Sequence, residues 1–471
     1  MKTGPMFSIH DVLAATGGTL QGGLLRDGIL FEGVSTDSRQ CSSGNLFVAL
    51  QGETFDGHHY LDQAIQKGAA GLLIHRRTEK TPQDLPVILV RHTLMALGDL
   101  AHFWRQKFSP TILAITGSSG KTTTKEMAAA ILGRGRKILK TEGNYNNLIG
   151  LPLTLFNLKH DNTTAILELG TNQRGEIARL TKIAAPEIGL ITNIGPAHLE
   201  GFADLTGVAE EKKDLFLNMP PEGTIIINHD DPFLRRSGDS WTGRCVYFGL
   251  KEGADVGAEK ITYRHAQGTS FTLRIGEEHQ EVIMPIAGEH QVMNALAAAA
   301  SAWAAGVTIA DIGQGLTNFS PVPGRMEVLP LKNGTFVIND TYNANPSSVG
   351  AALKTLKTLK GRGRSVVVLG DMLELGDQEE LWHQEIGGLL ADTGVDRVYL
   401  RGRLAGATAA GASKQGLPAS SVILREDPEA ITSDIISYAK DGDWILVKGS
   451  RRMKMEAIVE MIVSQVGRRR R

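Results

Sequence analysis

Cysteine is scarce in this chain of 471 residues, which contains only Cys41 and Cys245. Two cysteines far apart in the sequence exclude a disulfide framework and a cysteine-based zinc module, and they favour a reducing cytoplasm. Long apolar runs are also missing, because no stretch approaches the roughly 18 residues that span a bilayer. The N-terminal segment carries Pro5 and Asp11 where a secretory signal would need apolar residues. We therefore expect a cytoplasmic protein without membrane insertion.

The chain also lacks an excess of charge of either sign, since 50 Lys and Arg residues stand against 51 Asp and Glu residues. A net charge of −1 does not favour binding to a nucleic acid or to an acidic membrane surface. The run of arginines at 468–471 is local, and we expect a solvated or frayed terminus there. Glycine, in contrast, is abundant with 54 residues, which indicates many tight turns and loops that can approach phosphate groups.

Continuous apolar runs of strand length alternate with helical patterns through the middle of the chain, at 111–116, 165–169, 187–194 and 224–228. Such doubly buried strands predict a mainly parallel sheet with helices on both faces. From Tyr263 to Pro285 the pattern shifts toward alternation, which indicates antiparallel strands.

The length predicts roughly three domains at about 150 residues each. The segment SPVPGR at 320–325 combines two prolines with a glycine, and the strand–helix rhythm restarts after it, with a helix expected over 346–359. We predict an α/β fold whose central P-loop-type sheet is flanked by two further α/β domains, the last of them Rossmann-like. The expected domains are 1–91, 92–321 and 322–471.

The segment TILAITGSSGKTTTKEM joins a predicted buried strand to a helix through a glycine-rich turn. Backbone N–H groups in such a turn, together with the helix dipole, hold phosphate oxygens. Lys121 would reach the outer phosphates, and the Thr122 hydroxyl could ligate magnesium. The spacing from Gly117 to Gly120 is two residues tighter than the usual P-loop formula, which wants glycine at Ile115. An ordinary glycine turn before a basic helix is the alternative, and the order of strand, loop and helix favours nucleotide binding.

Two polar residues follow predicted strands of the middle region, at the carboxyl edge where ligands gather in parallel sheets. Glu168 lies near the C-terminal end of AILEL and His198 lies in NIGPAHLEGF, so both are candidate magnesium ligands. A solvated strand-end charge and a satisfied loop histidine are the alternatives. Lys212 lies in EEKK, a pattern typical of a solvated helix face, and the residues alone assign it no function.

The asparagine cluster GNYNNLIGLP at 143–152 lies close in sequence to the glycine turn. Amide side chains supply neutral donors and acceptors without adding charge near an anion. A turn-rich loop is the alternative to a binding loop.

Together these segments resemble the Mur ligases, ATP-dependent amide-forming enzymes of peptidoglycan precursor synthesis, over nearly the whole chain. The branch that joins D-alanyl-D-alanine to UDP-N-acetylmuramoyl-tripeptide through an acyl phosphate is the most similar, on DTYNANPSS, VLGDMLELG and NIGPAHLEGF. The remaining motifs that carry the resemblance are STDSR (35–39), FVALQGETFDGH (47–58), TGSSGKTTTKE, GNYNNLIGLP, ELGTNQRGEI (168–177), GEHQVMNALAA (288–298), PGRME (323–327) and LVKGSRRMKME (446–456).

The resemblance implies a nucleotide site and a metal site. Glu168 and His198 match magnesium ligands of the family, with Thr122 beside them, and two magnesium ions are expected. Lys212 matches a carbamylated lysine, although adjacent Lys213 leaves the register open. The residues that match groups around ATP are Gly117, Ser118, Ser119, Gly120, Lys121, Thr122, Thr123, His290, Asn294, Arg325 and Asp340. The residues expected to be catalytic are Lys121, His198, Lys212 and Asp340.

The resemblance also implies small-molecule substrates and a monomer that binds no nucleic acid. The first domain would bind the UDP-sugar-peptide, and the last would close over ATP and bind the dipeptide. Matching substrate residues are Ser38, Arg39, Asp56 and His58 for uridine diphosphate, Asn147 for the sugar-peptide, and Tyr342, Asn343 and Asn345 for the dipeptide or the nucleotide. The alternatives are a sibling Mur ligase, a folylpolyglutamate synthetase-like ligase and a nucleotide-binding switch.

Overall fold

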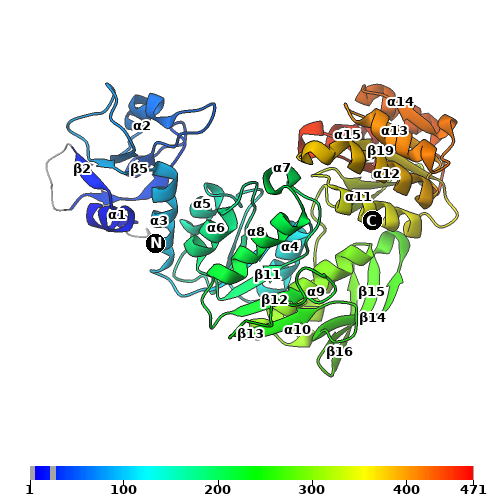
Figure 1. The fold of residues 1–471 in the computed structure, drawn as a ribbon, viewed down its shortest axis with the longest axis horizontal. Coiled ribbons are helices and arrows are strands. Elements are labelled where there is room, and N and C mark those ends of the chain that lie inside the picture. Colours follow the sequence, from blue (N-terminus) through cyan, green and yellow to red (C-terminus); the bar gives the residue numbers. More distant parts are fainter. Residues whose placement is uncertain (1–5, 22–27, 470–471) are drawn as a thin grey trace.

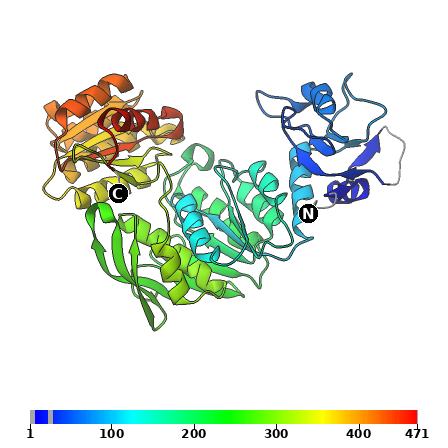
Figure 2. The same ribbon diagram turned by 180° about the vertical axis from the view of Figure 1, so that it is seen from behind.

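The computed structural model describes residues 6–21 and 28–469, which form three lobes arranged in an arc (Figures 1 and 2). The first and last lobes stand on either side of the central one, and each is built around its own sheet. Residues 1–5, which begin the segment considered for a secretory signal, and residues 470–471 of the arginine run lie outside the described residues. Within the described ranges, none of the helices is long and apolar enough to cross a membrane.

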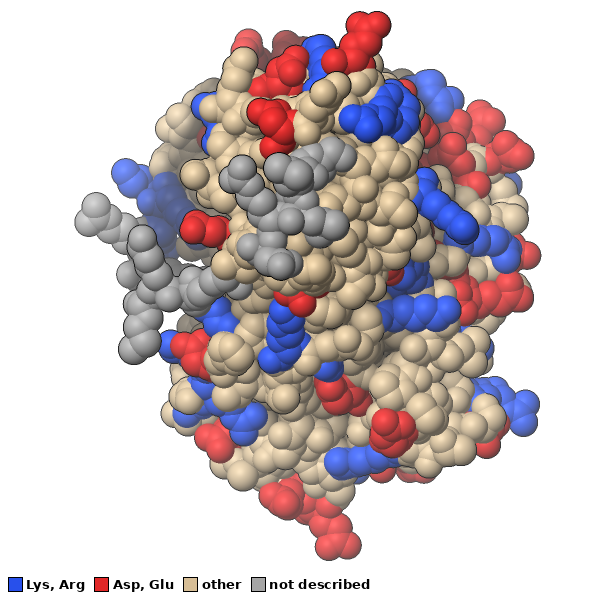
Figure 3. Space-filling model, turned by 90° about the vertical axis from the view of Figure 1, so that its left-hand side faces the viewer, with Lys and Arg blue, Asp and Glu red and all other residues tan. Residues whose placement is uncertain are grey.

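The first lobe is a five-stranded sheet of order β2-β7-β6-β5-β4, with β2 antiparallel to its neighbour and the other strands parallel. A short antiparallel pair, β1 with β3, lies beside it. Basic and acidic side chains are interspersed on the face of this lobe shown in Figure 3. Its elements are β1 (Phe7–Ser8), α1 (Ile9–Thr16), β2 (Thr19–Gln21), β3 (Leu30–Phe31), β4 (Gly33–Ser35), β5 (Asn45–Val48), η1 (Gly57–Tyr60), α2 (Leu61–Gln66), β6 (Gly71–Ile74) and β7 (Val87–Leu89).

The central lobe is a nine-stranded sheet of order β16-β15-β14-β13-β12-β11-β8-β10-β9. The mainly parallel sheet that the apolar runs predict is confirmed. The strands from β8 to β14 are parallel, and β15 and β16 continue the sheet in antiparallel pairing with their neighbours. Its elements, with the helix α3 that leads into it, are α3 (Thr93–Arg105), β8 (Thr111–Thr116), α4 (Lys121–Leu132), β9 (Ile138–Lys140), α5 (Gly150–Leu155), β10 (Thr164–Glu168), α6 (Glu176–Ala184), β11 (Ile188–Ile191), α7 (Leu199–Phe202), α8 (Leu205–Asn218), β12 (Thr224–Asn228), β13 (Arg244–Phe248), β14 (Val256–Tyr263), η2 (His265–Gln267), β15 (Thr269–Ile275), β16 (Glu278–Met284), α9 (Glu289–Ala304) and α10 (Ile309–Thr317).

The third lobe is a six-stranded sheet of order β17-β18-β22-β19-β20-β21, parallel except for the edge strand β17. Helices cover both of its faces, which agrees with the predicted Rossmann-like α/β arrangement (Figure 1). Its elements are β17 (Glu327–Pro330), β18 (Phe336–Asp340), α11 (Pro346–Leu359), β19 (Ser365–Gly370), η3 (Gly376–Gln378), α12 (Glu379–Thr393), β20 (Arg397–Arg401), α13 (Ala405–Lys414), η4 (Ala419–Ser421), β21 (Val422–Leu424), α14 (Pro428–Tyr438), β22 (Trp444–Lys448), η5 (Arg451–Met453) and α15 (Glu456–Val466).

Helix α11 has the bounds that the sequence predicts. Asn345 caps it, because its Oδ1 accepts a hydrogen bond from the N–H of Ser348 at 2.9 Å. Pro346 occupies the first turn, where its missing N–H costs nothing. Val349, Leu353 and Leu356 are buried on one face against the sheet.

Of the two expectations for the C-terminus, the solvated one holds for Arg468 and Arg469, which are exposed, and the frayed one is wrong for them. The backbone N–H of Arg469 donates to Pro330 O at 2.8 Å, and Arg468 forms an isolated bridge with Leu331. Arg468 also lies 3.5 Å from Glu327 as an ion pair. Pairing with the edge of the sheet therefore orders this end of the chain.

Three parallel strands of the central sheet, β8, β11 and β10, place the candidate site. Their carboxyl ends lie at the same edge, because β8 is paired with the other two in parallel register. The glycine turn follows β8, Glu168 ends β10, and His198 follows β11. This edge faces the third lobe (Figure 1).

Helix α9 is buried against α4 and the sheet, and its alanine-rich stretch is almost entirely excluded from solvent. We predict that Ala298→Leu lowers the free energy of unfolding by about 1–3 kcal/mol, because extra methyl groups cannot fit in a filled core. Urea unfolding followed by circular dichroism measures this change. Ala304→Leu on the same helix is the control, since Ala304 is only partly buried and its larger side chain can reach solvent. Equal effects at the two positions would contradict the packing described for α9.

Candidate active site

The glycine turn between β8 and α4 is compact and can be built only with glycine at its two ends. Gly117 and Gly120 have left-handed φ angles of +145° and +80°. A Cβ atom at Gly117 would collide with Thr192 Oγ1, and one at Gly120 would collide with Asn294 Oδ1. The turn leads directly into the first turn of α4, so its N–H groups lie at the positive end of a helix.

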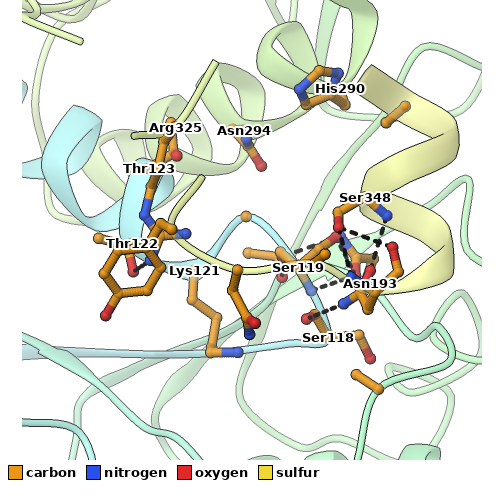
Figure 4. Close-up of a pocket in the computed structure, with 18 of the residues that line it drawn as sticks. Ser118, Ser119, Lys121, Thr122, Thr123, Asn193, His290, Asn294, Arg325 and Ser348 are labelled. Carbon is orange, nitrogen blue, oxygen red and sulfur yellow. Dashed lines mark hydrogen bonds between the residues drawn. The ribbon is translucent and has the colours of Figure 1, made fainter. Parts of the chain in front are cut away.

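Asn193, which follows β11, holds the turn in place and was not singled out by the sequence. Its Oδ1 accepts from the N–H of Ser119 at 3.1 Å, and its carbonyl accepts from the N–H of Ser118 at 3.0 Å. Figure 4 shows these residues gathered opposite the start of α11, which carries Ser348. The signal available in the sequence was a polar residue directly after a buried strand.

Lys121 begins α4, and its side chain folds back over the turn. Its Nζ donates to Gly117 O at 2.7 Å. Burial lowers the pKa of Lys121, while the nearby Glu168 carboxylate acts in the opposite direction. The ammonium group of Lys121 therefore lies close enough to the turn to interact with an anion bound there.

Thr122 Oγ1 joins the central lobe to the third lobe. It donates to Glu168 Oε2 at 2.8 Å and accepts from Arg325 Nη2 at 2.8 Å. Glu168 is 3% exposed, and its other oxygen accepts from Asn146 Nδ2 at 2.9 Å. A carboxylate, a hydroxyl and a guanidinium thus converge beside the turn.

The donors around Glu168 fit a hard cation. Its carboxylate accepts hydrogen bonds from two neutral groups, Thr122 and Asn146, and hydroxyl and carboxylate oxygens are ligands that magnesium prefers. His198 lines the same cavity, with its Nδ1 2.6 Å from Glu374 Oε2. Among the described residues, no group of three or more His, Cys, Asp and Glu side chains lies close enough to hold a metal ion.

Lys212 is buried on α8, with 2% of its surface exposed. Burial, with help from the charge of Lys121, lowers its pKa to about 7. Its neighbour Glu211 is also buried and accepts from the N–H groups of Gly175 and Ile177 at 2.6 and 2.9 Å. The solvated helix face expected from EEKK is therefore wrong for these two residues, because α8 packs them against α6 and the loop before it. Lys213 is only partly buried.

His290 and Asn294 lie on α9 and line the cavity on the side away from Ser118 (Figure 4). Asn294 Nδ2 donates to Gln291 Oε1 at 3.0 Å. Burial lowers the pKa of His290 to about 4, so the imidazole is neutral at pH 7. These side chains offer neutral polar groups and a flat ring beside the turn.

Asp340 in the third lobe is tied to a lysine that the sequence analysis did not single out. Its Oδ2 accepts from Lys448 Nζ at 2.6 Å, and its Oδ1 accepts from the N–H of Met326 at 3.0 Å. Lys448 also donates to Asn343 O at 2.9 Å. A buried pair of this kind fixes the loop that follows β18.

Two further side chains of the third lobe, Arg325 before β17 and Asn345 after β18, face the central lobe. The Arg325 guanidinium stacks over the ring of Tyr342 at 4.0 Å, which orients it toward Thr122. Asn345 Nδ2 donates to Ser118 O at 3.4 Å. Because of these contacts, the third lobe reaches the glycine turn itself.

A cavity of about 800 Å³ lies between the central and third lobes. Gly117 and Lys212 lie outside its lining. The predicted residues that line it are Ser118, Ser119, Gly120, Lys121, Thr122, Thr123, Asn147, Glu168, His198, His290, Asn294, Arg325, Asp340, Tyr342, Asn343 and Asn345.

A second cavity, of about 1160 Å³, lies between the first and central lobes. Asp37, Lys107 and Tyr145 are among its lining residues, and Asn147 lines both cavities. Asn147 Oδ1 accepts from the N–H of Gly150 at 2.8 Å and so supports the start of α5.

The four first-lobe residues expected near uridine diphosphate do not line this second cavity. Ser38 is buried and donates to Gln63 Oε1 at 2.6 Å, whereas Arg39 is exposed and pairs with Asp37 at 2.9 Å. His58 is fully buried, with its Nδ1 2.7 Å from Asp56 Oδ1.

Asp56 is held by its neighbours. Burial raises the pKa of its carboxyl, but hydrogen bonds from the His58 backbone and from Arg76 outweigh this and lower it overall. The contacts of Ser38, Asp56 and His58 stabilise the fold of this lobe.

Comparison with known families gives a consistent assignment along the chain. The family described as "Mur ligase family, catalytic domain" matches residues 30–105, "Mur ligase middle domain" matches residues 115–302, and "Mur ligase, glutamate ligase domain" matches residues 324–451. These matches follow one another in the order of the three sheets.

Individual relatives agree with these matches. The UDP-N-acetylmuramoyl-tripeptide–D-alanyl-D-alanine ligase of Bacillus subtilis is 37% identical over 92% of this chain and 93% of its own length. A crystal structure of MurF from Acinetobacter baumannii superposes with a TM-score of 0.89 at 32% identity, covering 98% of this chain and 100% of that one. MurF from Thermotoga maritima in complex with ADP has a TM-score of 0.83 at 30% identity, covering 94% of this chain and 99% of that one. With this identity over nearly its whole length, the chain belongs to the Mur ligase family.

Proposed function

We propose that this protein is an ATP-dependent ligase that joins D-alanyl-D-alanine to UDP-N-acetylmuramoyl-tripeptide and releases ADP and phosphate. The observation that carries the proposal is the convergence of Glu168 and Arg325 on Thr122 Oγ1, next to a phosphate-type turn. The proposal assigns this carboxylate to a cation and the fixed positive charge to the outer phosphates of ATP. The names of the relatives supply the identity of the two substrates.

ATP would bind with its phosphates in the turn from Gly117 to Thr123 and its base toward His290 and Asn294. The Thermotoga relative in complex with ADP supports a nucleotide in a protein of this fold. Magnesium would be held by Thr122, Glu168 and His198, and it would supply neutralisation of the phosphate charges. Lys121 of the central lobe and Arg325 of the third lobe add two cations to the same cavity.

A peptide carboxylate is a poor electrophile, so it must be activated before it can form an amide. The tripeptide carboxylate attacks the γ-phosphorus of ATP, which forms an acyl phosphate and releases ADP. The amine of D-alanyl-D-alanine then attacks the acyl carbon, the new amide bond forms, and phosphate leaves. Phosphoryl transfer requires alignment and charge neutralisation more than covalent help from the protein, and the turn, Lys121 and Arg325 meet that need.

Acyl phosphates react with water, so the cavity must also exclude solvent. The third lobe contributes to this through Arg325 and Asn345, which bond to Thr122 and Ser118 across the cavity. We propose that closure of this lobe, residues 322–471, completes the site and that the incoming dipeptide binds at Tyr342 and Asn343.

The sugar-peptide would extend from this cavity into the second one, with residues 1–91 holding its uridine diphosphate end. Asn147 supports this path because it lines both cavities. The two free cysteines favour a reducing cytoplasm, and a monomer is sufficient because one chain lines both cavities.

We also propose that Lys212 is carbamylated and helps to hold a second magnesium ion. Carbamate forms from a neutral amine and carbon dioxide, and burial supplies that amine by lowering the pKa of Lys212 to about 7. Of the two adjacent lysines, Lys212 is the one whose burial fits this role, since Lys213 is partly exposed.

Lys121→Ala should lower kcat by about 100-fold or more, because it removes a charge aimed at the outer phosphates. Release of ADP in the presence of both substrates measures the loss. Lys67→Ala, which removes an exposed lysine of the first lobe, should leave the rate unchanged. Turnover of Lys121→Ala within a few-fold of wild type would show that the turn is not the phosphate site.

The choice of amine should be specific. With ATP and UDP-N-acetylmuramoyl-tripeptide present, D-alanyl-D-alanine should stimulate ADP release, whereas diaminopimelate, lysine and glutamate should not. Mass spectrometry should find UDP-N-acetylmuramoyl-pentapeptide as the product. Stimulation by a single amino acid instead would assign the chain to a sibling Mur ligase or to a folylpolyglutamate synthetase-like activity.

Carbamylation of Lys212 can be detected directly. Protein equilibrated with ¹³C-bicarbonate should show a carbamate carbon resonance that is lost in Lys212→Ala and retained in Lys213→Ala. Because only the neutral amine reacts, the signal should grow as the pH rises from about 6 to 8 through the lowered pKa. A signal that is lost in Lys213→Ala and retained in Lys212→Ala would show that Lys213 is the modified residue.

A further inference from the structure

His198 and Glu374 meet across the boundary between the central and third lobes. His198 lies between β11 and α7, and Glu374 lies between β19 and η3. His198 Nδ1 is 2.6 Å from Glu374 Oε2. Both residues have left-handed φ angles, +55° and +65°, a conformation that is costly for side chains other than glycine and that clusters at functional sites.

The contact is supported by packing of the third lobe on α7. Leu199, Phe202 and Val208 form a small buried cluster in the central lobe, and Trp382 of α12 packs against it. At Gly376, a Cβ atom would lie 3.4 Å from Glu200 Cα, so the backbone of η3 runs close to that of α7. Docking of the segment 374–382 on α7 therefore brings Glu374 to His198.

The contact with Glu374 bears on which ring nitrogen of His198 carries the proton. The buried Nδ1 of His198 has no hydrogen bond of normal geometry among the described residues, and its ion-pair contact is with Glu374 Oε2 at 2.6 Å. This carboxylate is therefore the group placed to attract its proton. With the proton on Nδ1, the lone pair is on Nε2 and can be offered to a cation. Carboxylates commonly set the tautomer and the ring orientation of metal-binding histidines in this way.

We propose that Glu374 is a positioning residue that keeps the His198 proton on Nδ1, so that Nε2 is ready for magnesium only while the third lobe is docked on α7. The proposal rests on the metal role proposed above for His198. It makes the cation site dependent on an acidic side chain from another lobe, which links lobe docking to metal binding.

The first measurement follows the tautomer in metal-free, full-length protein labelled with ¹⁵N-histidine. Long-range proton–nitrogen spectra at pH 8 should show His198 protonated on Nδ1 in wild type, with the resonance identified by its loss in His198→Gln. In Glu374→Ala the proton should move to Nε2, the tautomer that a histidine side chain prefers in water. Wild-type protein with the proton on Nε2 would overturn the proposal.

The second measurement is Mn²⁺ binding by electron paramagnetic resonance in the presence of ADP. Glu374→Ala should weaken Mn²⁺ binding by about 10–100-fold. Glu374→Gln should lie between this variant and wild type, because its amide oxygen accepts the hydrogen bond without the charge. Glu380→Ala is the matched control, since Glu380 is an exposed carboxylate in the first turn of α12 and should leave binding unchanged.

The outcomes separate this inference from the proposed function. Mn²⁺ affinity of Glu374→Ala equal to that of Glu380→Ala would overturn the role of Glu374 while leaving the ligase activity standing. A rise confined to the KM for D-alanyl-D-alanine would also overturn it and assign Glu374 to recognition of the amine. Failure of wild type to bind Mn²⁺ with ADP would overturn both this inference and the metal role of His198, whereas the product assay tests the ligase activity by itself.

Discussion

The electrostatic demand of a polyphosphate is the constraint around which this molecule is arranged. An anion held away from bulk water needs donors and cations that are already in place. The turn after β8 supplies N–H groups at the start of α4, and its geometry excludes any side chain at Gly117 and Gly120. Asn193 and Thr192 brace the turn from the next strand, so the cradle is preformed.

The parallel sheet explains why chemically different groups meet at this cradle. Strands β8, β10 and β11 end at one edge, and the polar residues that follow them are neighbours in space although tens of residues separate them in sequence. The third lobe adds the Arg325 guanidinium, a cation that comes from outside the central sheet. Arg325, oriented by Tyr342, bonds to the same hydroxyl that Glu168 accepts from. The hydroxyl, the carboxylate and the guanidinium therefore meet at the boundary between the central and third lobes.

Much of the architecture was predictable from local patterns. Buried strands such as 111–116 and 224–228 are continuous apolar runs, and helix α11 has a capping residue, a first-turn proline and an apolar face in consecutive positions. The glycine turn was also predictable, because its N–H groups, its lysine and its threonine are adjacent in sequence. These features depend on neighbours along the chain, so the sequence alone determines them.

Contacts between distant segments were decided only by the tertiary structure. EEKK has the pattern of a solvated face, yet α8 buries Glu211 and Lys212 while Lys213 stays partly exposed. Conversely, Ser38 and His58 lie in recognisable motifs, but their side chains bond within the first lobe. Lys448 forms an ion pair with Asp340, and Glu374 forms one with His198. In each pair the two residues are far apart in sequence, so neither pair could be predicted from local pattern. Burial and charge pairing depend on which surfaces pack together, and no local pattern encodes that choice.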